Sequence, residues 1–589
     1  MSWIRSNKWL MIMILLLVLS IGWAVYSVIV HTSDTSTNSG FSGMRQNGSF
    51  GSGGSRPDGS FTGRSSEFGR GGSSSRNDAG ITQVPRGSDG ASTSDGTDRN
   101  PRADSPEGRP GQGITGSPNI DTGRNGESGE RPGMPQGGGS RFGAGEASGS
   151  GSTELLLYAL LFFGAAAAAI PLMKRRKSEA VVRPAMIWMA IVIGLSIRIA
   201  LAPQVAGHPF DLNLFRNWAN AAAKGLSDFY SSSNSDYPPL YIYMLYLVGK
   251  LTSTAALSPY STLLIKLPSM LADMVTAYLL YRIGRKYISA GIGLAAAVFY
   301  AFNPAVLINS TYWGQVDSFF TLLIICGIWF ISQCKLSWAA LFMAAAIMMK
   351  PQGIIFLPVL GFALLQSGSW RAWIRAMGTA AAVVIVTALP FAWGQEPLWL
   401  YKLYAGTVGE YPYASVNAFN FYSLIGANYK QASSTMLLFS YHAWGLIFIV
   451  LAVLFTCWMT LRNRNPLLAA AAALTLIALV FTFSTSMHER YLFPAAALAI
   501  VAYFQLRDQR LLWLTLGFSV TIFFNTYYIF YYSTSGGASY GAVLFLISLL
   551  NILLCGWLIK VLWNLSSSNK PAGLQAPASP ALHTQVLEM

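Results

Sequence analysis

Long apolar stretches dominate this sequence, and they restrict the chain to folds that a lipid bilayer accepts. Residues 9–30 read WLMIMILLLVLSIGWAVYSVIV. As a helix, this run is long enough to cross the ~30 Å hydrocarbon core of a membrane. Further apolar runs follow from residue 154 to residue 563, and only 11% of all residues are charged. Because a backbone in lipid must satisfy its own hydrogen bonds, we predict an all-α polytopic membrane protein.

The basic residues indicate topology rather than nucleic-acid binding. The net charge is +15, but the lysines and arginines form short clusters between apolar runs. This pattern is typical of cytoplasmic loops in membrane proteins. Arg5 and Lys8 precede the first run, which places the N-terminus in the cytoplasm. We favour an uncleaved anchor over a signal peptide, because the run is long and no small-residue cleavage site follows it.

Residues 31–153 have a different composition from the rest of the chain. They contain 30 of the 56 glycines and no Trp, Tyr, Cys or Lys, and twelve arginines nearly balance thirteen acids. Such a segment buries too little apolar surface to offset the entropy of ordering it. We predict a disordered extracytoplasmic spacer.

One ambiguous run decides the topology of everything after it. LYIYMLYLVGKL, residues 240–251, is too short to cross a bilayer as a helix, since it would reach only about 18 Å. If it crossed, RIGRK (282–286) and every later basic cluster would lie outside the cell. We therefore predict one external loop over 204–260 with two juxtamembrane helices, and both termini in the cytoplasm.

The remaining runs give fourteen predicted spans, about twelve in a core domain and two before it. They cover residues 9–30, 154–173, 184–203, 262–281, 287–308, 317–333, 336–349, 353–366, 376–393, 436–461, 466–485, 491–505, 511–531 and 541–563. The predicted domains are an anchor (1–30), the spacer (31–153), a second span with a basic end (154–177), a membrane domain (178–564) and a cytoplasmic tail (565–589).

This topology brings the unusual polar motifs to one boundary. The motifs are HPFD (208–211), DYPPLY (236–241), NPAVLINSTYWGQVD (303–317), KPQ (350–352), EYPYASVNAFN (410–420) and MHERYLFP (487–494). All six map to the external end of the predicted spans, whereas the cytoplasmic end has basic clusters and little else. Ionisable groups gathered at one membrane face indicate a functional site.

The chemistry of this site can be narrowed from the residue types. The sequence has no phosphate-binding P-loop, no dinucleotide fingerprint and no HExxH metal motif. An external membrane enzyme commonly uses a lipid-linked donor, whose phosphate leaves once its charge is neutralised. The acceptor hydroxyl then needs a carboxylate base, and the phosphate needs cations. The sequence supplies both types at this boundary: Asp211 is the carboxylate, and the cations are Lys350, His488 and Arg490.

The same motifs resemble those of a known superfamily. Asp211 with FRNW (215–218), DYPPLY, WGQVD, KPQ and MHERYLFP is similar to the GT-C glycosyltransferases that use polyprenyl- or dolichyl-phosphate sugars. The resemblance is closest to bacterial proteins related to the second mannosyltransferase of GPI-anchor synthesis, and the late motif also resembles that of the dolichol-pathway glucosyltransferases. It covers about residues 178–564.

The resemblance implies a GT-C-like fold and roles for particular residues. It implies that Asp211 is the catalytic base and that His488, Arg490 and Lys350 contact the donor phosphate. Other positions of the matching motifs become candidate substrate-binding residues: Asp236, Tyr237, Gln315, Asp317 and Glu489. We expect no metal and no cofactor beyond the lipid-phosphate sugar.

Simpler roles remain open for several of these residues. Asp211 can have a purely structural role, as a helix cap or first-turn acid. Asp236 and Asp317 can cap the helices that follow them, Lys350 can mark a helix end before Pro351, and Glu489 can orient Arg490. The roles of two charged residues inside the spans are open as well: Arg198 can snorkel or meet the donor phosphate, and Asp273 can be structural.

The expected function is therefore transfer of one hexose, with mannose favoured, from a polyprenyl-phosphate carrier to an acceptor outside the plasma membrane. The acceptor is a glycan, lipid or protein, and the surrounding membrane lipids are the other partners. The first alternative is a flippase or transporter for lipid-linked sugars, which needs polar groups near the bilayer midplane. The second is a non-catalytic envelope scaffold that acts through the glycine-rich segment.

Overall fold

Helices make up nearly all of the regular structure in this protein. The structure is a computed structural model that describes residues 2–39, 151–175, 182–533 and 537–567. Within these ranges, nine helices are long and apolar enough to cross a membrane, and only one two-stranded sheet is present. The prediction of an all-α polytopic membrane protein is confirmed.

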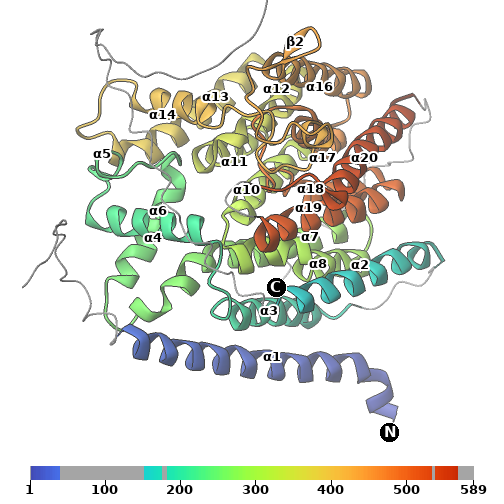
Figure 1. Ribbon diagram of the computed structural model, residues 1–589. Coiled ribbons are helices and arrows are strands. Elements are labelled where there is room, and N and C mark those ends of the chain that lie inside the picture. The colour runs from blue at the N-terminus through green and yellow to red at the C-terminus, as the bar shows by residue number, and fades with distance from the viewer. Residues whose placement is uncertain (1, 40–150, 176–181, 534–536, 568–589) are drawn as a thin grey trace, which may run out of the picture. The chain divides into compact units, whose positions relative to one another are not determined.

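The first half of the chain forms the helices coloured from blue to green in Figure 1. Its helices are α1 (Ser2–Ser39), α2 (Ser152–Arg175), α3 (Pro184–Leu201), α4 (Pro209–Lys224), α5 (Phe229–Ser232), α6 (Pro239–Thr252), η2 (Ser258–Tyr260), α7 (Ser261–Tyr287), α8 (Ala290–Ala301), α9 (Pro304–Leu307) and η3 (Ile308–Trp313).

The second half continues with α10 (Asp317–Ser332), α11 (Leu336–Met349), η4 (Pro351–Phe356), α12 (Leu357–Ser367), α13 (Trp370–Ala388), η5 (Leu389–Phe391), α14 (Trp399–Gly409), α15 (Phe421–Leu424), α16 (Tyr441–Asn463), η6 (Pro466–Leu468), α17 (Ala469–Phe483), α18 (Ala495–Leu506), α19 (Arg510–Tyr532) and α20 (Ala542–Ser567). The strands β1 (Thr435–Met436) and β2 (Phe439–Ser440) pair antiparallel.

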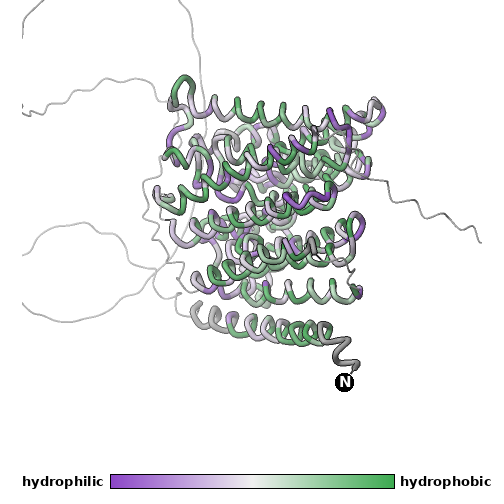
Figure 2. The backbone as a smooth tube through the Cα atoms, turned by 90° about the vertical axis from the view of Figure 1, so that its right-hand side faces the viewer, coloured by the Kyte–Doolittle hydropathy of each residue, from purple (hydrophilic) through white to green (hydrophobic). Residues whose placement is uncertain are grey.

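Each of the fourteen predicted spans falls on a helix. Nine meet the length and hydropathy of a membrane span, and four coincide with shorter apolar helices: α10, α11, η4 with α12, and α18. The predicted span 287–308 is not one straight helix. It divides at Asn303 into α8 and the α9–η3 segment, which together are bent by 44°. Figure 2 shows long hydrophobic stretches along the helices and hydrophilic segments at several of their ends.

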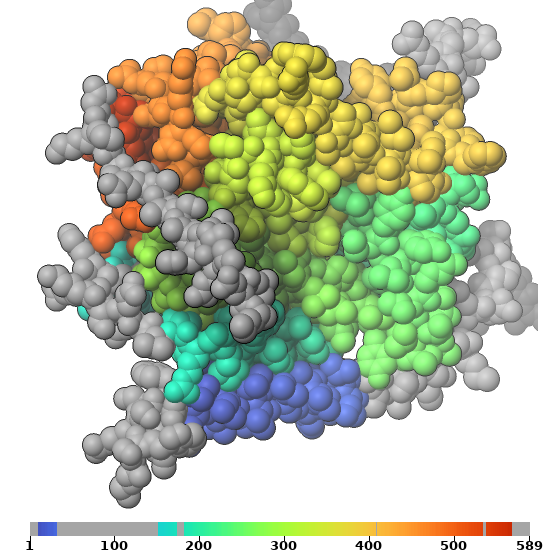
Figure 3. Space-filling view, turned by 180° about the vertical axis from the view of Figure 1, so that it is seen from behind, coloured from blue at the N-terminus to red at the C-terminus, as the bar shows by residue number. Residues whose placement is uncertain are grey.

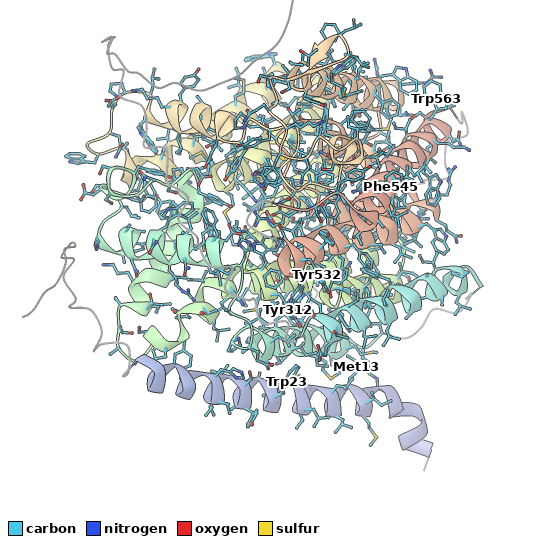
Figure 4. The ribbon with its side chains drawn as sticks, viewed as in Figure 1. Met13, Trp23, Tyr312, Tyr532, Phe545 and Trp563 are labelled. Atoms are coloured by element: carbon cyan, nitrogen blue, oxygen red, sulfur yellow. The ribbon has the colours of Figure 1, made fainter. Side chains whose placement is uncertain are left out.

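The two helices before the core domain pack against it at defined contacts. α1 lies along α3, and the Ser27 hydroxyl donates to the Ala200 carbonyl at 2.6 Å (Figure 1). α2 contacts α19, where the Tyr527 hydroxyl donates to the Ser152 carbonyl at 3.0 Å. At the far end of α20, Trp563, labelled in Figure 4, stacks on Trp458 of α16 with ring centroids 4.8 Å apart.

Two predicted boundary segments extend beyond the described residues. The spacer prediction for 31–153 falls almost wholly outside them, although α1 continues as a helix to Ser39. The cytoplasmic tail predicted from 565 overlaps the end of α20 at Ser567, and the rest of it lies outside the described residues.

The structure decides the roles of the charged residues inside the spans. The Arg198 Nε atom of α3 lies 3.3 Å from the Asp273 Oδ2 atom of α7, and both side chains are buried. Arg198 therefore neither snorkels nor reaches the site. Lys266, seven positions before Asp273, instead donates to the carbonyls of Ala202 and Val205 at 3.1 and 2.7 Å.

Candidate functional site

The predicted polar motifs meet in space. The backbone NH of His208 donates to the Trp313 carbonyl at 3.1 Å, which joins HPFD to the WGQVD motif. The Val416 NH donates to the Met487 carbonyl at 3.0 Å, which joins EYPYASVNAFN to MHERYLFP. Side chains complete the network between the other motifs. The polar site is thus assembled from segments spread over most of the core domain.

Asp211 owes its position to two glycines beside the start of α4. Gly207 and Gly314 both have positive φ, +84° and +88°, which few other residues adopt. A Cβ atom at either position would lie within 3.0 Å of the Leu212 side chain. The π-helical turn η3 ends at Gly314, and π-helical turns are frequent at functional sites. The missing Cβ atoms therefore allow α4 to approach the turn that carries Trp313.

The Asp211 carboxylate has three partners on one oxygen. Oδ2 accepts a hydrogen bond from Trp313 Nε1 at 2.6 Å and from Arg490 Nη1 at 2.9 Å. His208 Nδ1 lies 3.3 Å from the same atom, and the His208 ring stacks on the Trp313 ring with centroids 4.6 Å apart. Asp211 is in the first turn of α4, as expected, but His208 occupies the cap position. The Asp211 side chain is therefore committed to the site and not to capping.

These contacts set the charge of Asp211. Burial raises the pKa of Asp211, but the charge of Arg490, the nearby His208 ring and the hydrogen bond from Trp313 outweigh burial and hold the pKa of Asp211 well below its usual range. Asp211 is therefore ionised at neutral pH. It is also a weak base for as long as Arg490 stays beside it, because the same contacts that hold the charge disfavour protonation.

Arg490 connects two carboxylates across the site. Its Nη1 atom contacts Asp211, its Nε atom lies 3.1 Å from Glu489 Oε1, and its guanidinium carbon lies 4.8 Å from the Trp313 ring centroid. Burial raises the pKa of Glu489 despite the opposing charge of Arg490. Glu489 therefore pairs with Arg490 and orients it, which was one of the roles left open for it.

Lys350 and Asp317 form a second ion pair at this boundary. Lys350 Nζ lies 2.5 Å from Asp317 Oδ1, and Asn309 Nδ2 donates to Asp317 Oδ2 at 3.1 Å. Asp317 begins α10 but makes no capping hydrogen bond, so the capping interpretation is wrong. Lys350 does follow the last residue of α11, as expected for a helix end, and it is also a buried partner for a carboxylate.

Asp236 is paired with a second acid instead of capping a helix. Pro238 is the cap residue of α6, so the capping interpretation of Asp236 is wrong. The Asp236 side chain lies beside Glu410, the residue that follows α14, and the two carboxyl groups interact. Burial raises the pKa of both, that of Glu410 to about 7. One proton is therefore shared between these carboxyl groups near neutral pH.

Tyr237 is held in an aromatic cluster beside this pair. Its ring lies 5.4 Å from Trp218 and 5.3 Å from Tyr241, centroid to centroid. Its backbone carbonyl accepts a hydrogen bond from the Tyr230 hydroxyl at 2.7 Å. The cluster fixes the DYPPLY motif against α4, so Tyr237 positions its neighbour Asp236 as well as lining the site.

His488 is neutral in the folded protein. Burial and the charges of Arg490 and Lys350 lower the pKa of His488 to about 3. Its ring meets the Tyr411 ring edge-on, with centroids 4.4 Å apart. In the protein without a bound phosphate His488 therefore carries no positive charge. A neutral imidazole can still donate one hydrogen bond.

Several buried polar atoms in these motifs have no hydrogen-bond partner among the described residues. They are both side-chain polar atoms of Gln315, His208 Nδ1, Asn309 Oδ1, Gln352 Oε1, His488 Nε2 and Arg490 Nε. Leaving such a group unsatisfied costs about 1–3 kcal/mol. Gln315 is almost fully buried, and its side chain retains hydrogen-bonding capacity that the described residues do not use.

Some contributors were not singled out from the sequence. Trp313 and His208 lie within motifs that were recognised, but their own roles depend on contacts across 102 residues of chain. Glu410 and Tyr411 likewise begin a recognised motif. A tryptophan or histidine beside a candidate carboxylate was the available signal. Among the described residues, no group of three or more His, Cys, Asp or Glu side chains is arranged to hold a metal ion.

Fold and site together define a polytopic membrane protein with a polar, ion-paired site at one end of its helices. A family model described as GPI transamidase subunit PIG-U matches residues 215–405, less than half of the 589-residue chain. No curated protein matches this sequence. The matching family is a membrane-protein family of the GPI pathway, and it is not the mannosyltransferase family that the motifs resemble. The matched range includes Asp236 and Lys350 but not Asp211 or Arg490.

Proposed function

We propose that this protein is a membrane glycosyltransferase of the GT-C type. It moves one hexose, with mannose favoured over glucose, from a polyprenyl-phosphate carrier to a hydroxyl on the outer face of the plasma membrane. The observation that supports this proposal is the contact between Asp211 and Arg490, a carboxylate and a guanidinium that are 279 residues apart in the chain. Adjacent base and cation are what displacement of a phosphate by a hydroxyl requires.

In the proposed step the acceptor oxygen forms a bond to the anomeric carbon as the bond from that carbon to the phosphate oxygen breaks. The hydroxyl proton passes to Asp211. The electron pair leaves with the polyprenyl phosphate, whose charge Arg490 and Lys350 balance. Attack opposite the leaving group inverts the anomeric centre. These side chains supply the charge, so the proposed step uses no metal and no cofactor.

Donor binding itself would make Asp211 a better base. In the unliganded protein Arg490 lowers the basicity of Asp211. A donor phosphate that draws the guanidinium toward itself removes the largest interaction that opposes protonation of Asp211. The base is then active only when the sugar is in place, which limits unproductive hydrolysis.

The test is the Asp211→Asn variant. Purified wild-type and variant protein are added to membranes from cells that lack this chain, together with polyprenyl-phosphate mannose that carries a radiolabelled sugar. Asparagine keeps the shape and accepts the Trp313 hydrogen bond, but it cannot take a proton. We expect transfer to fall by at least ~10²-fold with donor binding near normal. Near-wild-type turnover would sink the assignment and make Asp236 the next candidate base.

A second candidate function is recognition of a lipid-linked glycan by a non-catalytic subunit of a membrane complex. The match to the GPI transamidase subunit family favours it, because that match excludes Asp211 and Arg490. In this case wild-type protein would bind the radiolabelled donor without transferring the sugar. Co-purification of other membrane proteins with the tagged chain would then identify the complex.

A further inference from the structure

A basic cavity lies at the end of the helices that is opposite to the site. Its volume is about 630 Å³, and it lies between the start of α11, the end of α12, the start of α13 and the link from α16 to η6. Lys335, Arg375 and Arg464 line it, together with Trp338 and Gln366. The described residues that line this basic end cavity include no Asp or Glu.

The lengths of two helices, α10 and α11, give the distance between the cavity and the site. α10 runs from Asp317 in the site to Ile331 in the cavity wall, and α11 runs from Leu336 in the wall to the residue before Lys350. At 1.5 Å per residue, each path is about 21 Å long. The cavity is therefore separate from the carboxylates and cations of the site.

The three cations of the cavity are not neutralised within the described part of the chain. Ion pairs to Asp or Glu are found for Arg198, Lys350, Lys402, Arg490 and Arg510, but for none of Lys335, Arg375 and Arg464. The hydrogen bond from Arg375 Nε goes to the Arg371 carbonyl at 3.4 Å, which supplies no charge. Three like charges around one space favour binding of an anion there.

The surroundings of the cavity indicate that the anion belongs to a lipid. α13 is a candidate membrane span, and Ala376 is its one buried residue. Ile374 and Met377 are more than half exposed beside the cavity, as is Trp338 at its rim. In Figure 3 the yellow surface of α12 and α13 adjoins the orange surface of α16. Tryptophan beside a lipid-facing helix is typical of the headgroup level of a bilayer.

We propose that the basic end cavity binds the headgroup of an anionic phospholipid, with its acyl chains along the exposed face of α13. Basic pockets between membrane helices are known to bind such headgroups. Binding there would also hold this end of the helices at the anionic leaflet. The inference does not depend on the reaction proposed for the site.

The test compares lipid retention by two matched variants of the full chain. The cavity variant carries Lys335→Gln, Arg375→Gln and Arg464→Gln. The control variant carries Arg282→Gln, Arg285→Gln and Lys560→Gln, which removes the same charges from exposed positions outside the cavity. Each protein is purified in phosphatidylcholine with added phosphatidylglycerol, and the bound lipid is counted by native mass spectrometry. We expect the cavity variant to bind phosphatidylglycerol at least ~tenfold more weakly, because each cation contributes separately.

Thermal unfolding in phosphatidylcholine alone checks that both variants are folded. If the triple cavity variant is unstable, the single variant Arg464→Gln, at an exposed residue, replaces it. It should weaken phosphatidylglycerol binding several-fold. Equal retention by cavity and control variants would overturn the proposal. So would displacement of the lipid by inorganic phosphate, since the cavity would then bind a free anion and not a headgroup. The proposal is supported if the control variant retains phosphatidylglycerol, the cavity variant does not, and inorganic phosphate does not displace the lipid.

Discussion

Asp211 and Asp273 both pair with an arginine, yet the two pairs are built in different ways. Asp211 lies at the start of α4, and its partners Trp313 and Arg490 come from distant loops and turns. Its side chain is 14% exposed. Asp273 lies inside α7, is fully buried and faces Arg198 from the neighbouring helix at 3.3 Å. A charged side chain at a helix end can be reached by a ligand, whereas a charged side chain buried inside a bundle of helices cannot.

This difference bears on the flippase alternative. A transporter of lipid-linked sugars is expected to have exchangeable polar groups near the midplane. Arg198 and Asp273 pair with each other, but Arg198 Nη2 and Asp273 Oδ1 have no hydrogen-bond partner among the described residues, and the same is true of Gln315 at the boundary. Unsatisfied polar atoms therefore do not distinguish the two pairs, and the variants below are needed to separate the enzyme from the flippase.

The sidedness of the network is the first thing to test, because the expected effect is all or none. Cysteine at Ser232, an exposed residue at the end of α5, should react with a membrane-impermeant thiol reagent in intact cells, and cysteine at Arg285 should not. Gly284 is unsuitable as the inner probe, since any Cβ there would lie 2.6 Å from Gly293.

Both probes are introduced after Cys334→Ala, because Cys334 is an exposed free thiol. Permeabilised cells should label at Arg285→Cys as well, which shows that this thiol is reactive. Labelling of both probes in intact cells would mean that α6 crosses the membrane, because Ser232 precedes α6 and stays outside while Arg285 moves outside. The predicted single boundary for the polar motifs would then be wrong.

The two ion pairs should respond differently when both partners are replaced. Arg198→Met alone leaves Asp273 buried without its partner and should destabilise the protein by about 3–5 kcal/mol. Adding Asp273→Leu should restore stability and leave sugar transfer intact. The double variant Lys350→Met, Asp317→Leu should also be stable, because it leaves no buried charge without its partner. Its transfer activity should be low, because the donor phosphate loses a cation.

Thermal unfolding in lipid nanodiscs and the transfer assay are measured on the same preparations of wild type and all three variants. Full transfer activity in the Lys350→Met, Asp317→Leu protein would make that pair structural, like the one inside the helices. Lost transfer in a stable Arg198→Met, Asp273→Leu protein would bring the buried pair into the mechanism.

Arg490→Lys sharpens the role of the boundary cation with less disturbance. Lysine keeps the positive charge but cannot contact Asp211 and Glu489 through two separate nitrogens. Loss of one charge-assisted contact is worth about 1.5–3 kcal/mol, so donor binding should weaken by about ten- to a hundredfold. Arg216→Lys, at an arginine of α4 that bonds Asn213 and Thr262, is the matched control and should change nothing. Equal donor binding in both variants places the phosphate elsewhere.

The sequence predicted which segments meet, but not which atoms. Apolar runs have recognisable ends, so their polar termini could be assigned to one boundary. The contact between Asp211 and Trp313 depends on a π-helical turn and a left-handed Gly314, which leave no periodic pattern. The capping interpretations of Asp236 and Asp317 failed for a related reason. A pattern shows the helix that follows an acid, but not the Glu410 or Lys350 that approaches it from another part of the chain.

The pair of Arg198 and Asp273 could not be predicted either, because 75 residues separate its members and the helices α4, α5 and α6 lie between them in the chain. Each residue could be recognised as unusual within its own span, and the sequence left the role of each open. Helix packing decided both roles. Charged residues inside apolar helices can therefore be identified from sequence, whereas their partners require the packing of the helices.

The smallest expected effect concerns the acid pair at the boundary, Asp236 and Glu410. Burial and the charge of Asp236 raise the pKa of Glu410 to about 7, from an ordinary value of 4.5. The folded state therefore holds a proton on Glu410 that the unfolded chain releases between pH 4.5 and 7, so this group's stabilising contribution is full below 4.5 and is lost as pH rises through about 7. Glu410→Gln carries no titrating proton and should flatten that part of the pH dependence of stability.

The measurement is the thermal midpoint of wild type and variant from pH 5 to 8, with Glu396→Gln, an exposed acid paired with Lys402, as the control. The difference between wild type and Glu410→Gln should grow with pH up to about 7 and stay constant above it. A difference independent of pH would mean that Asp236 and Glu410 do not share a proton near neutral pH.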